Sequence, residues 1–418
     1  MSKTRTILND CKLYIFIILL GAAAGAVLWC FLRAVEACTE LLWMTLPDMT
    51  GVNFLPLFIC TAGGAAAGII RKKYGDYPEE LPVVLGKIRH DKHYDYGPMP
   101  VMLICAFLPL ILGASVGPEA GLTGIIAGLC YWVGDNVKYA KEHTEVYSEI
   151  GAAITLAGIF HIPLFGIFAV EEPAAGDEIS QFHMPKVTKL LLYGLSIASA
   201  YLVMKGLGFL FGAVGEGFPS FEVMETSAAD YALILVYIPI GLVLFLIYTY
   251  VQKLMALISA RIPAILKETI CGLCIGGMAL LVPAVLFSGE KEMGVLADTF
   301  ANHTPPMLIG VCLLKLVMTA FCIEFGLKGG HFFPLIYACS CMGFGVALLT
   351  GNGVFAAAII NAAVLGAQIK KPIAVSLLLL ICFPIKYVLW IFVAAAIGGK
   401  IGAAIASLHG RKNGVEND

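Results

Sequence analysis

Long apolar segments with very few charges between them are the feature that most restricts this sequence. Only 13% of its 418 residues are charged, 27 basic and 29 acidic, whereas 59% are hydrophobic. Soluble domains carry about 25% charged residues, so this chain lacks the polar side chains that a water-soluble surface of its size requires. One membrane helix needs about 20 apolar residues, and the apolar material suffices for roughly ten to twelve crossings. The sequence therefore predicts an all-α polytopic membrane protein and excludes soluble enzymes.

Net charge and cysteine spacing indicate neither a nucleic-acid partner nor a metal site. The net charge is −2 and no long basic or acidic run occurs, so we expect the lipid bilayer and no nucleic acid around this chain. One C-x-x-C pattern joins Cys271 to Cys274, but it lies in apolar sequence without a second cysteine pair. We therefore predict no metal site and no cofactor.

The apolar segments fall into two halves of similar length. Residues 1–213 and 230–418 each hold several of them, and the polar stretch 214–229 between them is acidic and lacks Lys and Arg. We interpret this stretch as an external linker between pseudo-symmetric halves of one transmembrane domain. The tail after Gly410 is eight residues long, so we expect no soluble regulatory domain.

Basic residues flank the apolar segments and predict the orientation. Lys3 and Arg5 precede the first segment, and Arg411 and Lys412 follow the last. Since cytoplasmic flanks carry an excess of Lys and Arg, we predict a multi-pass protein of the cell (inner) membrane with both termini in the cytoplasm.

A glycine-rich break interrupts each half. Residues 113–121 read GASVGPEAG and residues 326–334 read GLKGGHFFP, and an apolar run follows each. Broken helices at corresponding places in two halves indicate a binding site near the membrane midplane. A helix N-terminus presents unpaired N–H groups and the positive end of the helix dipole, which together suit an anion. The sequence thus predicts two anion-binding N-termini facing each other; the alternative is two ordinary turns at the membrane surface.

Glu119 lies inside the first of these breaks. A carboxylate at membrane depth is costly and is by default a functional residue. At a helix N-terminus the charged side chain would occupy the position that an external anion needs, and the protonated side chain would leave it. We therefore predict that Glu119 is a gate responding to pH and anion concentration; the alternative is a glutamate that caps its own helix at the interface.

Three motifs in this order resemble the CLC family of chloride channels and proton-coupled anion transporters. Residues 113–121 resemble the family's G-x-S-x-G-x-E-G-P signature, with Glu119 on the gating glutamate, and residues 329–334 resemble G-G-x-F-x-P. Residues 160–172, FHIPLFGIFAVEE, are similar to the family's helix that ends in acidic residues. The resemblance implies an antiparallel inverted repeat of tilted and broken helices, and a homodimer with one pore per subunit.

The resemblance also implies a function and its residues. It implies transport of a small inorganic anion, chloride first, by a channel or an anion/proton antiporter, with protons as a second partner. Fluoride, nitrate or an organic solute remain alternative cargoes. Glu119 would be the gate, and Glu171 and Glu172 would form a proton pathway. The anion ligands would be backbone groups of Gly117, Pro118, Ala120, Gly330, His331, Phe332 and Phe333.

The sequence departs from the family pattern at several positions. The G-S-G-I-P anion motif is represented by residues 75–79, GDYPE, in which Asp76 stands where the serine is expected. Pro118 replaces a common basic residue. The pore tyrosine has no counterpart, because Ala403 lies near its place and Tyr387 comes too early. We interpret the chain as a divergent bacterial branch that keeps backbone ligands and has fewer side-chain ligands.

Competing interpretations concern polar residues inside apolar sequence. Ser115 lies in a G-x-S-x-G pattern and could pair with His161 in an intramembrane serine hydrolase, but a nucleophile elbow needs a preceding strand and a soluble sheet. We therefore predict that the chain is not an enzyme. Lys315 is expected to extend to the interface, or to pair with Glu324. His331 either adds a donor near the anion or is a partly exposed loop residue.

Overall fold

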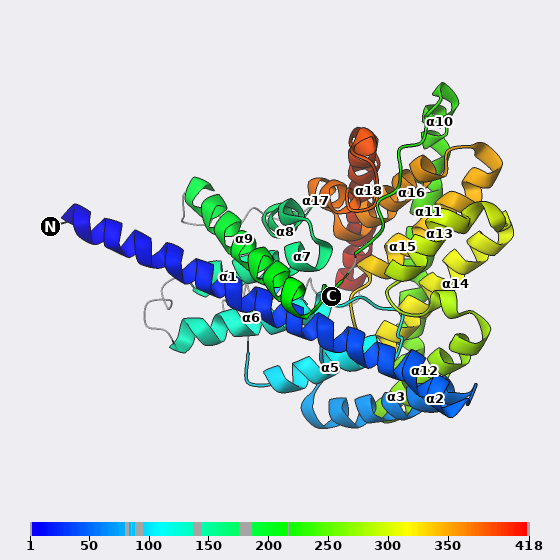
Figure 1. Cartoon of the computed structure of the whole chain (residues 1–418). Helices are drawn as coiled ribbons and strands as arrows, with labels where there is room; N and C mark the ends of the chain where they lie inside the picture. The colour runs from blue at the N-terminus through cyan, green and yellow to red at the C-terminus, as the bar shows by residue number, and fades with distance from the viewer. Residues whose placement is uncertain are drawn as a thin grey trace.

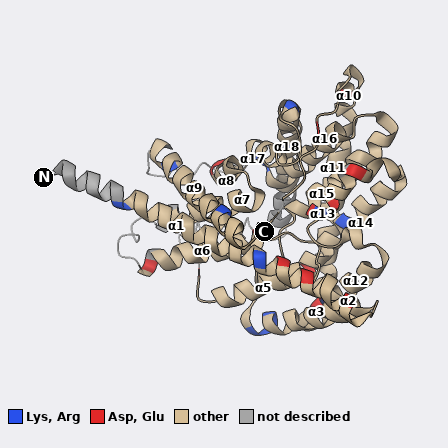
Figure 2. Cartoon of the chain, viewed as in Figure 1, with Lys and Arg blue, Asp and Glu red and all other residues tan. Residues whose placement is uncertain are grey.

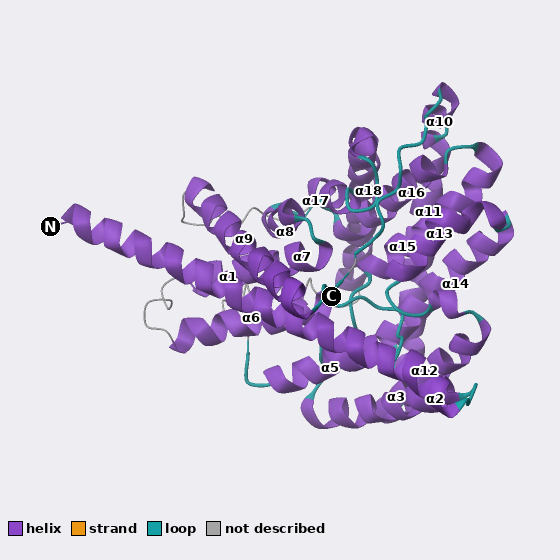
Figure 3. Ribbon diagram, viewed as in Figure 1, coloured by secondary structure: helices purple, strands orange, loops and turns teal. Residues whose placement is uncertain are grey.

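A computed structural model of the chain describes residues 2–79, 83–84, 86–87, 95–136, 144–174, 186–215 and 217–415. Helices and loops make up this part of the chain, as Figure 3 shows. The strand-like contact there is an isolated antiparallel bridge between Gly117 and Gly330. The all-α class predicted from composition is confirmed.

The first half is a series of helices of unequal length. The chain begins with a long helix, α1, which continues without a break through a π-helical turn into α2. The helices are α1 (Ser2–Glu40), η1 (Leu41–Thr45), α2 (Leu46–Thr50), α3 (Leu55–Tyr74), α5 (Met99–Ile111), α6 (Glu119–Asn136), α7 (Thr144–Phe160), α8 (Pro163–Glu171) and α9 (Lys186–Phe211).

The second half has the same mixture of long and short helices. They are α10 (Ala228–Ala232), α11 (Ile234–Ser259), α12 (Ala264–Leu281), η3 (Pro283–Val285), α13 (Glu290–Thr299), η4 (Phe300–Asn302), α14 (Pro305–Glu324), α15 (Phe332–Thr350), α16 (Gly353–Ile369), α17 (Pro372–Leu379), η5 (Ile385–Tyr387) and α18 (Val388–Val415).

The helices differ in their ability to span a membrane. Within the described residues, eight helical stretches are long and apolar enough to cross a bilayer, and α5, α6, α7 and α16 are apolar but shorter. Charged residues are sparse over the whole fold (Figure 2). Full spans beside short apolar helices are the pattern expected where broken helices surround a buried site.

Local sequence explains where the helices near the two breaks stop and start. Gly113 and Gly326 adopt φ values of +76° and +102°, which favour glycine, directly after α5 and α14. Pro118 immediately precedes α6, and its carbonyl accepts the N–H of Leu122 at 3.1 Å. Pro163 occupies the first position of α8, where its missing N–H has no helical partner to lose. The breaks are thus built by glycine and proline.

Packing brings sequence-distant helices together. The long α1 lies along α9 (Figure 1), α3 packs on α12, and α15 and α16 form the buried centre. The α3–α12 contact depends on glycine, since a Cβ on Gly64 would lie 2.3 Å from the Glu268 carbonyl oxygen and one on Gly272 would lie 2.0 Å from that of Cys60. Small residues that let backbones approach closely are typical of membrane helix pairs.

The stretch 214–229 runs over the packed helices. The Gly215 N–H donates to Glu36 Oε1 at 2.7 Å, and the Phe221 N–H donates to the Cys382 carbonyl at 2.7 Å. Phe218 and Phe221 are buried. The predicted linker therefore contacts the first half through Gly215 and the second half through Phe218 and Phe221, and it ends in the first residues of α10.

Asp230 anchors the end of this linker, and its removal should lower stability. Its carboxylate accepts the Ser227 N–H at 2.7 Å and the Asn352 N–H at 3.4 Å, in a capping box at the start of α10. Burial acts in the opposite direction, but these hydrogen bonds hold the pKa of Asp230 below its ordinary value. We expect Asp230→Ala to cost about 1 kcal/mol, and to lower the thermal midpoint in detergent by roughly 2 °C.

The stability lost in Asp230→Ala should depend on pH. A carboxyl whose pKa is lower in the folded state stabilises the fold above its unfolded pKa, and the gain disappears as the pH falls through the folded value. The wild-type midpoint should therefore exceed that of Asp230→Ala at neutral pH and converge with it in acid. An equal loss from Asp48→Ala, at an exposed aspartate of α2, would contradict the assignment.

Candidate functional site

The two glycine-rich breaks meet in the interior of the protein. The Gly117 N–H donates to the Gly330 carbonyl at 2.7 Å, and the Gly330 N–H donates to the Gly117 carbonyl at 2.7 Å. This reciprocal pair holds the beginning of α6 beside the beginning of α15. The prediction that the breaks face one another is confirmed, and the alternative of two separate surface turns is wrong.

Glu119 is the first residue of α6, and its carboxylate crosses to the other half of the protein. The side chain is almost completely buried, with 1% of the residue exposed. Its Oε1 accepts the N–H of Phe332, the first residue of α15, at 2.9 Å. Its Oε2 is buried without a hydrogen-bond partner among the described residues. A carboxyl group thus sits at the N-terminus of α15, where the helix dipole and the unpaired N–H groups favour an anion.

Glycine is required on both sides of this carboxylate. A Cβ on Gly330 would lie 1.8 Å from Glu119 Cδ, and a Cβ on Gly117 would lie 2.1 Å from Glu119 Oε2. Any side chain at either position would overlap the carboxylate. The two breaks are therefore shaped around the group that occupies them.

The N–H groups near the carboxylate divide into two sets. The N–H of Gly117 donates to the Gly330 carbonyl and that of Gly330 to the Gly117 carbonyl, because the breaks pair like strands. Contrary to the sequence expectation, neither N–H is left for an anion. Pro118 has no N–H to offer. The first-turn N–H groups without an intrahelical acceptor include that of Ala120 on α6 and those of Phe332 and Phe333 on α15. His331, the N-cap residue of α15, lies beside them.

Aromatic rings form one wall of the site. Phe333 stacks between Phe160 and Phe218, with ring centroids 4.5 Å and 5.1 Å away. Phe160 comes from the end of α7 and Phe218 from the stretch 214–229. His331 lies edge-on to Phe332 at 4.8 Å. This apolar wall excludes water, and electrostatic interactions beside it are correspondingly stronger.

Comparison of the sequence with known protein families agrees with this arrangement of the two breaks. Residues 63–403, which include both breaks, match the family described as voltage gated chloride channel. The chain belongs to this chloride channel family. Family membership excludes the hydrolase interpretation, and Ser115 accordingly pairs its hydroxyl with that of Thr319 at 2.9 Å in the buried interior.

Members of the chloride channel family are similar to this chain over most of its length. Chloride channel protein CLC-e of Arabidopsis thaliana is 23% identical over 354 residues, which cover 76% of this chain and 47% of the plant protein. The chain thus spans about half the length of that relative.

A solved CLC-type fluoride/proton antiporter has a TM-score of 0.75 at 20% identity, and the match covers 94% of this chain and 95% of the antiporter chain. A slow cyanobacterial Cl-/H+ antiporter has a TM-score of 0.76 at 18% identity and covers 93% of this chain and 94% of its own. These matches show the CLC fold, and the protein is a multi-pass membrane protein.

The two acidic residues predicted to form a proton pathway have different surroundings. Glu171 Oε1 lies 2.6 Å from Lys189 Nζ and accepts the Tyr193 hydroxyl at 2.8 Å. Lys189 also pairs with the buried Glu149 at 3.0 Å. Glu171 is thus one end of a charged chain that leads into α7.

Glu172, the neighbouring acid, is bound to a helix end. Its carboxylate oxygens accept the N–H groups of Ile373 at 3.0 Å and Ala374 at 2.7 Å. These N–H groups belong to the first turn of α17. Glu172 therefore caps α17 and joins it to α8. Among the described residues, no hydrogen bond or ion pair joins Glu171 or Glu172 directly to Glu119.

Lys315 does not extend to the interface, contrary to the sequence expectation. It is completely buried, and its Nζ donates to the carbonyls of Val285, Leu286 and Phe287 at 3.2, 2.7 and 2.7 Å. The three carbonyls lie at and after the 3-10 turn η3, where they lack helical donors. Lys315 supplies those donors from α14. The sequence near residue 285 does not indicate that its carbonyls require a distant donor.

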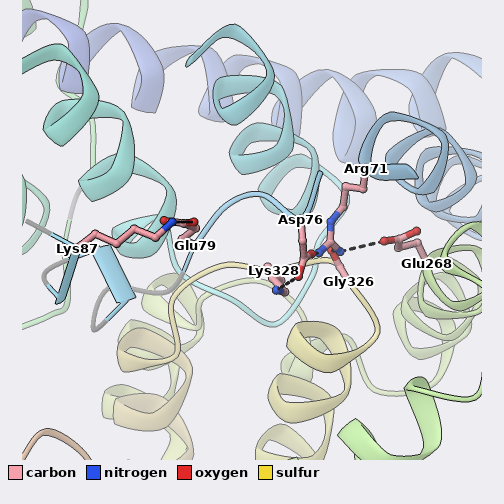
Figure 4. Close-up of polar contacts among 7 residues, drawn as sticks. All are labelled: Arg71, Asp76, Glu79, Lys87, Glu268, Gly326 and Lys328. Atoms are coloured by element: carbon pink, nitrogen blue, oxygen red, sulfur yellow. Dashed lines mark hydrogen bonds and ion pairs between the residues drawn. The ribbon is translucent and has the colours of Figure 1, made fainter. Parts of the chain in front are cut away.

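The structure also shows the partners of Tyr387 and Asp76, two residues that concern the missing side-chain ligands of the family. The Tyr387 hydroxyl donates to the Met224 carbonyl at 2.9 Å and thus holds the linker, not the anion site. Asp76, in the place of the expected serine, pairs with Arg71 and with Lys328 (Figure 4). Neither ion pair is predicted from the sequence: Lys328 lies 252 positions from Asp76 along the chain, whereas Arg71 precedes Asp76 by five.

Proposed function

We propose that the protein carries a small inorganic anion, chloride first, across the membrane along a pathway through the two glycine-rich breaks. One observation carries the proposal: the Glu119 carboxylate accepts the Phe332 N–H at the point where α6 and α15 begin. A carboxylate and a halide ion have the same charge and need the same N–H donors. The N–H groups that bind one are therefore suited to the other.

The gate works by competition between two anions. While Glu119 is charged it occupies the Phe332 N–H and excludes the cargo. Protonation removes its charge and weakens this hydrogen bond, since bonds to charged acceptors are the stronger ones. The neutral side chain then leaves, and the cargo anion binds the N–H groups of Ala120, His331, Phe332 and Phe333. These N–H groups replace part of its hydration shell.

Two modes of transport are compatible with the gate at Glu119. If protons reach Glu119 from the cytoplasmic side through Glu171 or Glu172, each cycle exchanges anion for proton. The fluoride/proton and Cl-/H+ antiporters with a similar fold are named for such exchange. If no such route exists, the protein is a channel in which Glu119 responds to external pH.

The remaining expectations concern assembly and orientation. We propose a homodimer with one pathway in each subunit, and both termini on the cytoplasmic side of the cell (inner) membrane. Apolar side chains such as Leu164 on α8, Leu202 on α9 and Leu389 on α18 are exposed and offer a surface to a second copy or to lipid.

Reconstitution into liposomes tests the proposed function directly. Purified protein in vesicles loaded with chloride should release chloride when valinomycin carries the balancing potassium, while a pH electrode records proton uptake. Chloride release with proton uptake supports an antiporter, and release without it supports a channel. Vesicles that retain chloride, fluoride and nitrate alike would refute anion transport.

A further inference from the structure

Lys315 is a buried charged residue that the transport mechanism above does not use. It lies on α14 with none of its surface exposed, and its Nζ donates to the three successive carbonyls of residues 285–287. An ammonium group has three N–H donors, so its donors match the acceptors of this turn in number. Lys315 therefore determines where the turn lies.

The turn has a conformation that needs this support. Phe287 has a φ of +53°, a left-handed backbone conformation that is unfavourable for a residue with a Cβ. Such conformations persist where the surrounding structure holds them, and they cluster at functional sites. Here the Phe287 carbonyl accepts Lys315 Nζ, and the Phe287 ring packs edge-on against Trp43 at a centroid distance of 5.0 Å. Without Lys315, one of these two supports is lost.

The same turn is bonded to the first glycine-rich break. The Phe287 N–H donates to the carbonyl of Gly113, the residue at which the break begins, at 3.1 Å. Gly113 is enclosed at this point, since a Cβ on it would lie 2.7 Å from the Trp43 ring and 3.4 Å from the Phe287 ring. A displacement of the turn therefore displaces the start of the break.

A second contact joins the same part of α14 to the break. Thr319, one helical turn after Lys315, donates its hydroxyl to the Lys315 carbonyl and pairs with the Ser115 hydroxyl, both at 2.9 Å. Ser115 precedes Glu119 by four residues, and Lys315, Thr319 and Ser115 are all buried. The break that carries Glu119 is thus fixed to α14 directly at Ser115 and through the turn at Gly113.

We propose that Lys315 is a positioning residue of the Glu119 gate. It holds the turn at residues 285–287, and the turn holds the start of the break, so that the Glu119 carboxylate meets the Phe332 N–H. This inference rests on the proposed transport function and adds to it a residue that acts through the turn. If Lys315 only stabilised the fold, its loss would lower the thermal midpoint and leave the pH response of the flux unchanged.

The charge of Lys315 must be separated from its effect on the turn. Among the described residues, the titratable groups near Lys315 or Glu119 are those of Glu290 and Glu292 on α13, Cys322 on α14, and Tyr337 and Cys341 on α15. A neutral residue in place of Lys315 changes the electrostatic potential at these groups as well as the turn. Gly113→Ala disturbs the contact with the turn and changes no charge, because the new methyl group meets the Trp43 ring.

Chloride flux from vesicles, measured against pH, tests the proposal. Lys315→Met leaves three carbonyls without a donor and loosens the break, so the Phe332 N–H stabilises the charged carboxylate less and the gate opens at higher pH. We expect the pH of half-maximal flux to rise by about one unit, which is a tenfold change in proton concentration. Gly113→Ala should raise it similarly. Lys315→Arg, which keeps the charge and the N–H donors, should stay near the wild-type value.

Combined variants show whether the effects follow one route. Lys315→Met together with Gly113→Ala should shift the pH of half-maximal flux about as far as either change alone, and not by their sum. In the Glu119→Gln background, Lys315→Met should leave chloride flux unchanged, because the gate that it positions is gone. Lys253→Met, at an exposed lysine of α11, is the matched control and should have the wild-type pH profile.

Two results would overturn the inference. The first is an unchanged pH profile in Lys315→Met; the second is an unchanged profile in Gly113→Ala, which would assign any effect of Lys315→Met to its charge. If Lys315→Met does not fold, Lys315→Gln, which loses the charge and one of the three donors, is read by the same criteria.

Hydrogen exchange of the backbone over residues 113–121 separates the positioning role from transport. We expect Lys315→Met to speed this exchange about tenfold, because the break opens locally more often. Wild-type vesicles that carry no anion, beside this faster exchange, would refute the transport function and keep the positioning role. Glu119-dependent chloride flux, with neither faster exchange nor a shifted pH profile in Lys315→Met, would refute the positioning role and keep the transport function.

Discussion

Exchanging Glu119 for glutamine should remove the response of anion flux to pH. Glutamine keeps the shape of the side chain, and its amide oxygen still accepts the Phe332 N–H, but it carries no charge at any pH. The cargo anion then competes with a neutral group, which a halide displaces easily. We expect chloride flux in vesicles to persist and to be flat from about pH 7.5 down to about pH 4.5, close to the reference pKa of a glutamate side chain.

The same variant separates the two modes of transport. If wild type couples anion release to proton uptake, Glu119→Gln should lower that uptake by more than about tenfold, a change of more than about 1.4 kcal/mol. Glu222→Gln, an exposed glutamate in the linker, should leave both fluxes at their wild-type values. A pH response that Glu119→Gln leaves intact would remove Glu119 from the gate.

The sequence sufficed to predict the fold class and the meeting of the two glycine-rich breaks. The low charge content requires a membrane protein, and the glycine breaks at 113–121 and 326–334 mark where helices are interrupted. Glycine and proline act locally, so their effect on helix ends can be predicted from neighbours along the chain. For this reason the break positions and Glu119 were predicted together.

The parts that could not be predicted depend on pairing between distant segments. The Gly117–Gly330 bridge uses N–H groups that the sequence assigns to the anion, because strand-like pairing across 213 positions leaves no local pattern. Lys315, and Arg71 through its ion pair with Glu268, each satisfy partners that are far away in the chain. The rule that a charged side chain extends to the interface fails for Lys315, since buried carbonyls at residues 285–287 bind it more strongly.

Adding one methyl group at Gly330 should have nearly as large an effect as removing the gate charge. The Cβ of Gly330→Ala would lie 1.8 Å from Glu119 Cδ, 2.0 Å from its Oε1 and 2.3 Å from its Cγ. Glu119 must therefore leave the Phe332 N–H, or the two breaks must separate. We expect the thermal midpoint in detergent to fall by the equivalent of about 1–3 kcal/mol, the usual cost of overpacking, and the pH response of the flux to be lost.

A double-mutant comparison distinguishes this clash from general damage to the break. Glu119→Ala removes the three atoms that the new methyl group would meet, so Gly330→Ala should cost little in that background. Glu119→Gln keeps those atoms and should not rescue it. The coupling energy between Gly330→Ala and Glu119→Ala should thus be about 1–3 kcal/mol, whereas Gly310→Ala, in open space on α14, should couple to neither variant. The Glu119→Ala background lacks the carboxylate contact but keeps the backbone pairing. If Gly330→Ala lowers the free energy of unfolding equally with and without the Glu119 side chain, the glycine is needed for the backbone pairing and not for the carboxylate.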